Sequence, residues 1–219
     1  MRPIIVSISG FSSNVGKTTL MCELLKRFPG REAIKISRGH YRSCGKDPET
    51  CCVSPLLGER PTIYSGRELT CVPRKDTGRY WEAGARNVHW LICTNDQLEA
   101  GIHEALSRVQ SAGVFIEGTS FLKYLPADFS IMVVDPSRSE IKSSAIRMVH
   151  RMNAFYVNTV EPDEKISEII RNKFAERNVQ VKDLPIYSAK NFEELVEKIM
   201  TIQTTSKFSS ITAPLNMNM

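Results

Sequence analysis

The sequence predicts a three-layer α/β fold in which helices cover both faces of a mainly parallel β-sheet. Short apolar, β-branched runs alternate with amphipathic stretches of helical period through most of the 219 residues. The first of these runs, residues 4–8, leads into a loop that ends in Gly16-Lys17-Thr18-Thr19, the closing half of a phosphate-binding loop. Because parallel strands need right-handed crossovers, any ligand is expected beyond the carboxyl ends of the strands.

The expected elements follow the chain in a regular order. Apolar runs predict strands at residues 4–8, 33–37, 88–93, 113–118, 129–135, 154–158 and 184–188, with a brief one at 70–73. Amphipathic runs predict helices at residues 18–28, 76–85, 96–110, 141–152, 163–177 and 191–202. Residues 38–62 read as a long polar loop, of a kind that is usually functional or mobile. One domain is therefore expected over residues 1–204, followed by a loose tail at 205–219.

The loop after the first strand carries the residue types that hold a phosphate. Its small residues let consecutive backbone N–H groups turn inward, and the free N–H groups of the next helix add positive potential. Lys17 supplies a cation for the β- and γ-phosphate oxygens, and Thr18 offers its hydroxyl to Mg²⁺. The predicted nucleotide contacts are Gly10, Ser12, Ser13, Asn14, Val15, Gly16, Lys17, Thr18 and Thr19.

The spacing of this loop departs from the usual one. In the standard motif G-x-x-x-x-G-K-[ST] the first glycine would fall at Phe11, whereas Gly10 lies one residue earlier. The longer spacing resembles the dethiobiotin synthetase and cobyrinic acid amide synthase branch of the P-loop NTPases, a class that also holds MinD and the metallochaperone GTPases. The alternative is a chance Gly-Lys-Thr in a surface loop, which the flanking strand and helix disfavour.

Three charged residues are candidates for the chemistry. Glu117 follows an apolar strand, where a carboxylate can hold Mg²⁺ or polarise the attacking water; a surface or helix-capping acid is the alternative. Lys35 ends a strand near the phosphate loop, where it could neutralise a γ-phosphate or remain a solvated lysine. Asp76 could be a second Mg²⁺ contact or a helix N-cap. The predicted catalytic set is Lys17, Lys35 and Glu117, and the predicted metal set is Thr18, Asp76 and Glu117.

Two short segments are candidates for binding the nucleotide base. Asn158-Thr159-Val160-Glu161 follows a strand at the place where GTP-binding proteins carry Asn-Lys-x-Asp, so Asn158 and Glu161 could contact the purine. Ser188-Ala189-Lys190, before a helix, is similar to the Ser-Ala-Lys loop of GTPases. Thr159 in place of lysine makes the first match partial. Together they favour GTP over ATP, with ATP as the alternative.

The composition limits the other partners. A net charge of +5 suits an anionic small ligand and does not demand nucleic acid. No apolar run is long enough to cross a bilayer, and the first strand leaves no room for a signal peptide, so a cytoplasmic protein without membrane contacts is expected.

The cysteines are expected to be thiols rather than disulfides. Cys22 and Cys93 fall in apolar segments and are expected in the core. The others, Cys44, Cys51, Cys52 and Cys71, share a loop region without the paired spacing that metal sites use, so incidental thiols are favoured over a metal site.

The order of the motifs is similar to that of one family. The phosphate loop, Lys35, the run from Arg74 to Ala85 and Ile116-Glu117-Gly118 together resemble molybdopterin-guanine dinucleotide biosynthesis protein B over about residues 3–135. The resemblance implies a nucleotide-binding, often dimeric protein that slowly hydrolyses GTP in molybdenum-cofactor maturation, with Asp76 and Glu117 serving metal and water. Two features depart from that family: the longer phosphate loop, and Ile36 where the family tends to have histidine.

Three functions therefore remain open from sequence. The first is an accessory NTPase that acts with a protein partner in cofactor biosynthesis. The second is a kinase or ATP-dependent ligase whose small substrate enters a pocket formed by residues 38–75. The third is a nucleotide-binding module without turnover.

Overall fold

A computed structural model describes residues 2–39, 56–158 and 165–211, and side chains as far as residue 202. The sheet is formed by eight strands: β1 (Ile4–Gly10), β2 (Glu32–Arg38), β3 (Thr62–Ser65), β4 (Val88–Cys93), β5 (Gly113–Glu117), β6 (Phe129–Val134), β7 (Ala154–Val157) and β8 (Ile186–Tyr187). The longer helices are α1 (Lys17–Arg27), α3 (Asp76–Glu82), α4 (Leu98–Ser107), α5 (Ser143–Met148), α6 (Ile166–Ala175) and α7 (Phe192–Ile211). Shorter turns of helix are α2 (Arg67–Thr70), η3 (Ser120–Lys123) and η4 (Val149–Arg151).

The strand order places the phosphate loop near the middle of the sheet. The order is β3-β4-β2-β5-β1-β6-β7-β8, and every pair except β3 with β4 is parallel. β1 lies between β5 and β6, so the loop that follows β1 is flanked by the carboxyl ends of both. This arrangement is the mainly parallel, three-layer αβα fold that the alternation of elements predicts.

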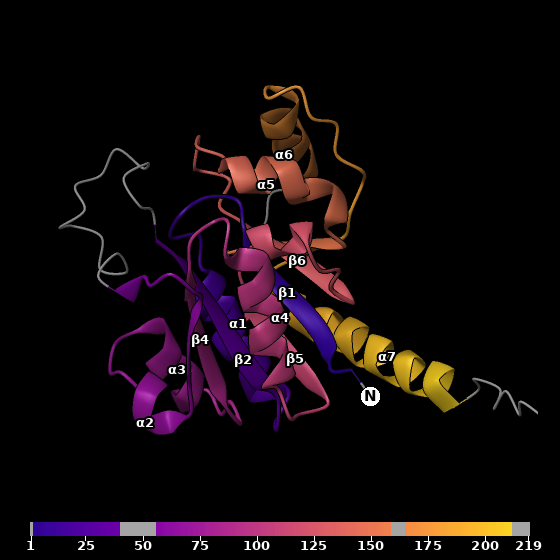
Figure 1. The fold of residues 1–219 in the computed structure, drawn as a ribbon. Helices are drawn as coiled ribbons and strands as arrows, with labels where there is room; N and C mark the ends of the chain where they lie inside the picture. Colours follow the sequence, from indigo (N-terminus) through magenta and orange to yellow (C-terminus); the bar gives the residue numbers. More distant parts are fainter. Residues whose placement is uncertain (1, 40–55, 159–164, 212–219) are drawn as a thin grey trace, which may run out of the picture.

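Two apolar layers hold the helices against the sheet. One layer combines inward residues of β1 and β5 with α1, α3 and α7, as shown by the buried Leu24, Tyr80 and Leu195. The other layer packs α4, η3, α5 and α6 on the opposite face, with Ile102 and Phe174 buried. In Figure 1, α5 and α6 lie together at the top, whereas α7 leaves the body at the lower right. Helices therefore cover both faces of the sheet, as predicted.

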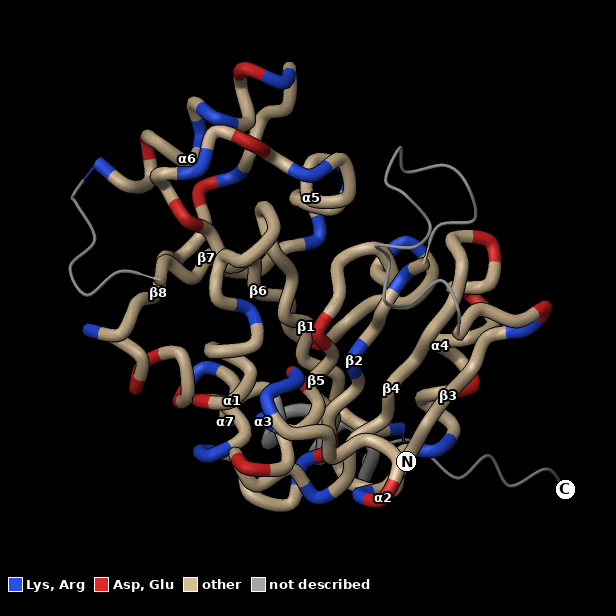
Figure 2. The backbone as a smooth tube through the Cα atoms, turned by 90° about the vertical axis from the view of Figure 1, so that its left-hand side faces the viewer, with Lys and Arg blue, Asp and Glu red and all other residues tan. Residues whose placement is uncertain are grey.

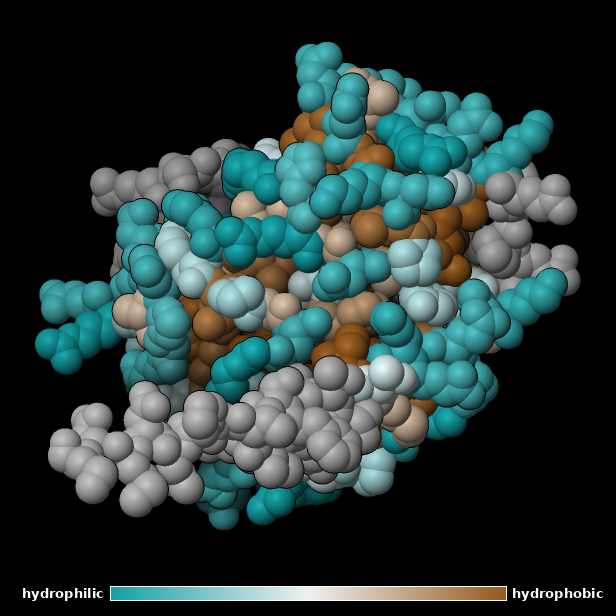
Figure 3. All heavy atoms as spheres, turned by 90° about the vertical axis from the view of Figure 1, so that its right-hand side faces the viewer, coloured by the Kyte–Doolittle hydropathy of each residue, from teal (hydrophilic) through white to brown (hydrophobic). Residues whose placement is uncertain are grey.

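Charge is concentrated in helices and loops. Most of the strand backbone in Figure 2 is uncharged, with isolated charged residues among β1, β2 and β5 at the centre. On the side from which α7 leaves, hydrophobic atoms show in several places, framed by hydrophilic side chains (Figure 3). Among the described residues, no helix combines the length and apolar character that crossing a bilayer requires.

Three local predictions differ from the structure. The strand predicted at residues 70–73 is wrong: Thr70 ends the short helix α2, where its hydroxyl donates to the Gly66 carbonyl oxygen at 2.7 Å. The edge strand β3, at residues 62–65, begins where the predicted loop of residues 38–62 ends and was not predicted. It pairs antiparallel with β4. Helix α7 runs to Ile211, past the predicted tail boundary at residue 205, and residues 212–219 lie outside the described chain.

Candidate phosphate-loop site

The extra residue of the phosphate loop is taken up by the sheet. The Phe11 N–H donates to the Val133 carbonyl oxygen at 2.9 Å, which continues the β1–β6 ladder by one residue. The Phe11 carbonyl oxygen accepts the Lys142 N–H at 2.9 Å, and its buried ring packs edge-on against Phe174 with ring centroids 5.5 Å apart. The open part of the loop therefore begins at Ser12, and the long spacing from Gly10 does not lengthen the turn itself.

The loop ends in a left-handed turn at the start of α1. Asn14 has φ 56° and Gly16 has φ 94°, a backbone conformation that glycine adopts without a steric penalty. The first N–H groups of a helix have no partner within it, and in α1 no side chain caps them. Such N–H groups at a helix N-terminus bind anions. Ser13 and Asn14 are exposed around this turn, whereas Val15 is buried and can offer only its backbone.

Lys17 folds back across Gly10. A β-carbon on Gly10 would lie 2.7 Å from Lys17 Cδ, closer than real contacts allow, and 3.0 Å from its Nζ. Burial lowers the pKa of Lys17 from its ordinary value, with Glu117 opposing the shift and Lys35 adding to it. Gly10 is thus the residue that lets this cation lie over the loop.

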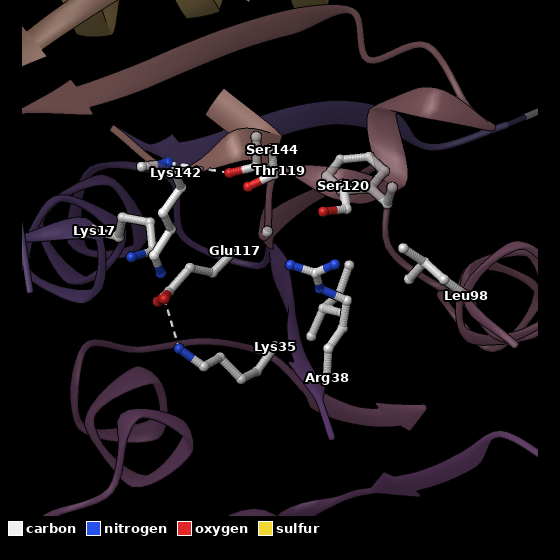
Figure 4. Close-up of a pocket in the computed structure, with 13 residues that line it drawn as sticks. Lys17, Lys35, Arg38, Leu98, Glu117, Thr119, Ser120, Lys142 and Ser144 are labelled. Atoms are coloured by element: carbon white, nitrogen blue, oxygen red, sulfur yellow. Dashed lines mark hydrogen bonds and ion pairs between the residues drawn. The ribbon is translucent and has the colours of Figure 1, made fainter. Parts of the chain in front are cut away.

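The Glu117 carboxylate is the centre of the site. Glu117 is buried, and its Oε1 accepts Lys35 Nζ at 2.5 Å. Its Oε2 accepts the Thr18 hydroxyl at 2.9 Å and also the hydroxyl of Tyr80. Three donors from α1, β2 and α3 therefore fix the carboxylate beside the phosphate loop. Figure 4 shows the contact with Lys35.

Lys35 bridges two carboxylates. Its Nζ lies 2.6 Å from Asp76 Oδ2 as well as contacting Glu117. Burial acts to lower the pKa of Lys35, but the negative charges of Glu117 and Asp76 outweigh it and the pKa is raised. Burial acts to raise the pKa of Asp76, and the Lys35 ammonium outweighs it, so that pKa is lowered. Both groups are held in their charged forms.

The position of Lys35 differs from the prediction. β2 continues to Arg38, so Lys35 lies within the strand rather than at its end. It nevertheless faces Glu117, because Lys35 and Glu117 are partners in the register of β2 and β5. The Lys35 side chain extends from the sheet to the carboxylates of Glu117 and Asp76, and Arg38 is the last residue of β2.

The donor set suits a hard divalent cation. Thr18, Asp76 and Glu117 supply a hydroxyl and two carboxylates around one point, and Mg²⁺ prefers such oxygen ligands while keeping waters and phosphate oxygens for the rest of its shell. The described part of the chain contains no group of three or more His, Cys, Asp or Glu side chains, so the site has two carboxylates and the Thr18 hydroxyl. The Lys35 ammonium already lies between the two acids, so a metal would share them with it.

The predicted base-binding residues lie on the other side of the loop. Asn158 follows β7, and a β-carbon on Gly16 would lie 2.7 Å from its Nδ2, so Asn158 packs against the phosphate loop. Ser188 follows the neighbouring β8 and is buried; its hydroxyl accepts the Lys190 N–H at 3.2 Å, while Ala189 is exposed. Glu161 lies outside the described residues.

Three residues of the site have no distinctive signal in the sequence. Tyr80 looks like helix-face packing, and its ring is buried, yet its hydroxyl reaches Glu117. Burial and the negative charge of Glu117 hold the pKa of Tyr80 well above its ordinary value, so the hydroxyl stays a donor. Lys142, before α5, and Arg38, at the end of β2, join the site from distant parts of the chain. The position of Arg38 after an apolar strand was the one available clue.

Three adjoining hollows surround these residues. The first, about 360 Å³, lies over the phosphate loop, between Ser13, Thr18, Asp76 and Arg79. The second, about 200 Å³, extends from Lys17 and Glu117 past Lys142 to Arg38 (Figure 4). The third, about 480 Å³, lies between α4, η3 and α5 and shares Arg38 with the second. A path thus runs from the phosphate loop across the edge of the sheet.

None of the three described cysteines lines these hollows. Cys22 and Cys93 are buried as predicted, and burial raises the pKa of the Cys93 thiol to about 11. Cys71 is a half-buried free thiol. Cys44, Cys51 and Cys52 lie outside the described residues.

Solved structures provide counterparts for the fold. HypB from Helicobacter pylori in complex with nickel is similar with a TM-score of 0.50 and 14% identity, over 93% of this chain and 88% of its own. Zn(II)-bound YjiA GTPase from E. coli gives a TM-score of 0.42 and 19% identity, over 87% of this chain and 59% of its own. LpxK from Aquifex aeolicus in complex with ATP gives 0.40 and 17%, over 86% and 71%. No family model and no curated protein matches the sequence. The likeness to HypB shows the P-loop NTPase fold.

Proposed function

We propose that this chain binds a Mg²⁺-bound purine nucleoside triphosphate on its phosphate loop and hydrolyses it. The observation that carries the proposal is the buried Glu117 carboxylate, held by Thr18, Lys35 and Tyr80 beside an uncapped helix N-terminus. A phosphate loop without such an acid could bind an anion, but it would lack a group that positions metal and water. The combination favours turnover over a purely binding role.

The residues divide the work by position. The N–H groups of residues 12–18 would bind the phosphate oxygens, with Lys17 and Lys142 contributing positive charge from two sides. Thr18, Glu117 and Asp76 would hold Mg²⁺, which neutralises charge on the β- and γ-phosphates when it is bound. Lys35 contacts both acids and orients them, and its charge lowers the pKa of Asp76. Glu117 would also orient the attacking water, since its position is fixed by three donors.

The base and the biological role are finer parts of the proposal. Asn158 packs against Gly16 at the edge where a purine would follow the phosphates, which supports Asn158 as a base contact and GTP as a candidate nucleotide. A role as an accessory GTPase in molybdenum-cofactor biosynthesis, acting with a protein partner or as a homodimer, rests on the motif order between Lys17 and Gly118. GTP-dependent stimulation by such a partner is the signature to look for.

Nucleotide binding is tested by Lys17→Ala. Loss of one charge-assisted contact to phosphate weakens binding by about tenfold to a hundredfold. Calorimetric titration with MgGTP and MgATP measures it, and Lys198→Ala, at an exposed position on α7, is the matched control for lost charge. Unchanged affinity in Lys17→Ala would refute the proposed phosphate cradle.

Turnover is tested by Glu117→Gln. The amide keeps the size of the side chain but removes the negative charge that serves metal and water, so nucleotide binding is expected to persist while hydrolysis slows by about a hundredfold. Phosphate release at saturating nucleotide measures the rate. Equal rates in the variant and the wild type would remove Glu117 from the mechanism.

Phosphoryl transfer to a small acceptor is the second candidate function. The path of hollows from Glu117 to the far side of the sheet supports it, because an NTPase that uses only water needs no such space. With γ-labelled nucleotide, hydrolysis places the label in inorganic phosphate, whereas transfer places it in an organic product.

A further inference from the structure

The large hollow between α4, η3 and α5 is positively charged. Arg38, Lys123 and Arg147 line it, and no carboxylate is among its described lining residues. Arg38 donates to the Asn95 amide oxygen at 2.7 Å, a neutral acceptor that leaves its charge uncompensated. Burial and the nearby Arg147 lower the pKa of Arg38, while Cys93 acts in the opposite direction. Positive side chains that face the same hollow repel one another, and an anion bound in the hollow would offset this repulsion.

The hollow also contains an unused hydrogen-bonding group. Ser120 Oγ is buried and has no hydrogen-bond partner in the described part of the chain. In Figure 4 its oxygen points toward the Arg38 guanidinium, with the Ser144 side chain across the same space. Buried hydroxyls almost always have a partner, and those that lack one often await a ligand or a water molecule. A hydroxyl beside a guanidinium is suited to an anionic oxygen.

The rest of the lining is apolar. Leu98, Met148 and the ring of Tyr124 complete the wall, and the volume of about 480 Å³ lies in the range of small-molecule sites. An inorganic anion would contact only the charged side of this space. The lining therefore fits a molecule that carries an anionic group on an apolar body.

We propose that this hollow is the binding site of a small, partly apolar anionic molecule, a carboxylate or a phosphate ester, that is the second ligand of the nucleotide site. Arg38, Leu98, Ser120 and Ser144 line both this hollow and the smaller one that reaches Lys17 and Glu117. A bound molecule would thus extend toward the terminal phosphate of the nucleotide. Only this last assignment rests on the proposed function; the anion site itself stands on the lining residues.

The test uses phenyl phosphate, with inorganic phosphate and phenol as its two halves. Calorimetry is carried out on the full chain with and without a saturating non-hydrolysable ATP analogue and Mg²⁺, so that the phosphate loop is filled in one series. Phenyl phosphate is expected to bind at least about tenfold more tightly than either half, because each half makes only one kind of contact. The preceding titration of the analogue reports nucleotide binding by itself, so failure of the proposed function is seen separately.

Two variants locate the binding. Arg147→Glu, at an exposed position, is expected to weaken phenyl phosphate binding by about tenfold or more. Arg177→Glu makes the same charge change at an exposed turn after α6, outside the lining of the hollow, and is expected to leave binding unchanged. Ser120→Ala is expected to weaken binding without lowering the melting temperature, since the Ser120 hydroxyl forms no hydrogen bond with the described residues. The proposal is overturned by absence of phenyl phosphate binding, by equal binding of inorganic phosphate, or by equal affinity in Arg147→Glu and the wild type.

Discussion

Replacing Tyr80 with phenylalanine tests whether the acid at the centre of the site is held as the structure indicates. The ring of Tyr80 is fully buried against α1 and the sheet, and Phe keeps that ring in place. The change removes only the hydroxyl that donates to Glu117 Oε2. Glu117 is itself 3% exposed, so water does not easily replace the lost donor. The variant therefore isolates one hydrogen bond to a buried carboxylate.

The expected loss of stability follows from the partners that remain. A hydrogen bond to a charged group contributes about 1.5–3 kcal/mol to the free energy of unfolding. Thr18 and Lys35 still bind the carboxylate, and the folded state no longer bears the desolvation of a phenol hydroxyl, so we expect about 1–2 kcal/mol. For a chain of this length each kcal/mol shifts the melting temperature by about 2–4 °C, which gives a decrease of roughly 2–8 °C.

Thermal melts followed by circular dichroism measure this shift against a matched control. Tyr156→Phe removes the hydroxyl of another buried tyrosine, one that donates to no carboxylate in the described part of the chain, and is expected to change the melting temperature by less than about 2 °C. The Tyr80 hydroxyl stays protonated because its pKa is raised, so the difference between the variants should persist from neutral pH to moderately alkaline pH. Equal melting temperatures for the two variants would show that Tyr80 does not hold Glu117.

Three further predictions concern stability and the phosphate loop. Burial acts to raise the pKa of Asp76, but the Lys35 ammonium outweighs it and the pKa is lowered, so ionised Asp76 stabilises the fold above pH 3.8, its ordinary pKa, and this stability is lost as the pH falls through the lowered pKa. In urea unfolding from neutral pH to about pH 3, Asp76→Asn should therefore lose less stability on acidification than the wild type. An equal loss in both would contradict the ion pair. Gly10→Ala should leave the melting temperature nearly unchanged, because only the flexible end of Lys17 must move, yet weaken calorimetric nucleotide binding by about tenfold; full affinity would exclude the folded-back Lys17. Phe11→Ala should destabilise the fold by about 3–5 kcal/mol in urea unfolding, and Phe11→Leu by less. A small loss in Phe11→Ala would mean that Phe11 does not anchor the loop.

The regular part of the fold could be predicted because local pattern and tertiary position agree there. Residues 88–93 are mostly apolar, with β-branched Val88 and Ile92, and they form β4 with those bounds. β3 is short and follows Pro61, so its pairing with β4 decides its conformation more than its own composition. Thr70 is β-branched and suggests a strand, but its hydroxyl bonds to the backbone one turn earlier and accepts the Trp81 indole N–H at 2.9 Å. Tertiary contacts override propensity at both places.

The site shows the same division between local and tertiary information. The phosphate loop is contiguous in sequence, so its residue types predict its shape directly. The partners of Glu117 come from α1, β2 and α3, and only the register between Lys35 and Glu117 brings two of them opposite each other. Register depends on how whole strands pair, which a single sequence does not specify. Tyr80 could therefore be recognised as a site residue only from the assembled sheet, whereas for Arg38 the place after an apolar strand was a clue.

The two edges of the sheet treat buried charge in opposite ways, and this difference supports the location of the site. At the amino edge Glu32 is 1% exposed; its Oε1 accepts the N–H groups of Gln110 and Ser111 at 2.8 and 2.7 Å, and its Oε2 lies 2.8 Å from His89 Nε2. Those contacts satisfy the carboxylate within the protein. At the carboxyl edge Glu117 is paired with Lys35, but the hollow that it borders is also lined by Lys17, Arg38 and Lys142, which form no ion pair within the described part of the chain. Buried charge that is fully paired stabilises or orients a fold, whereas uncompensated positive charge around a cavity requires an anion. The arrangement of charge therefore points to ligands at the carboxyl edge, on both sides of Glu117.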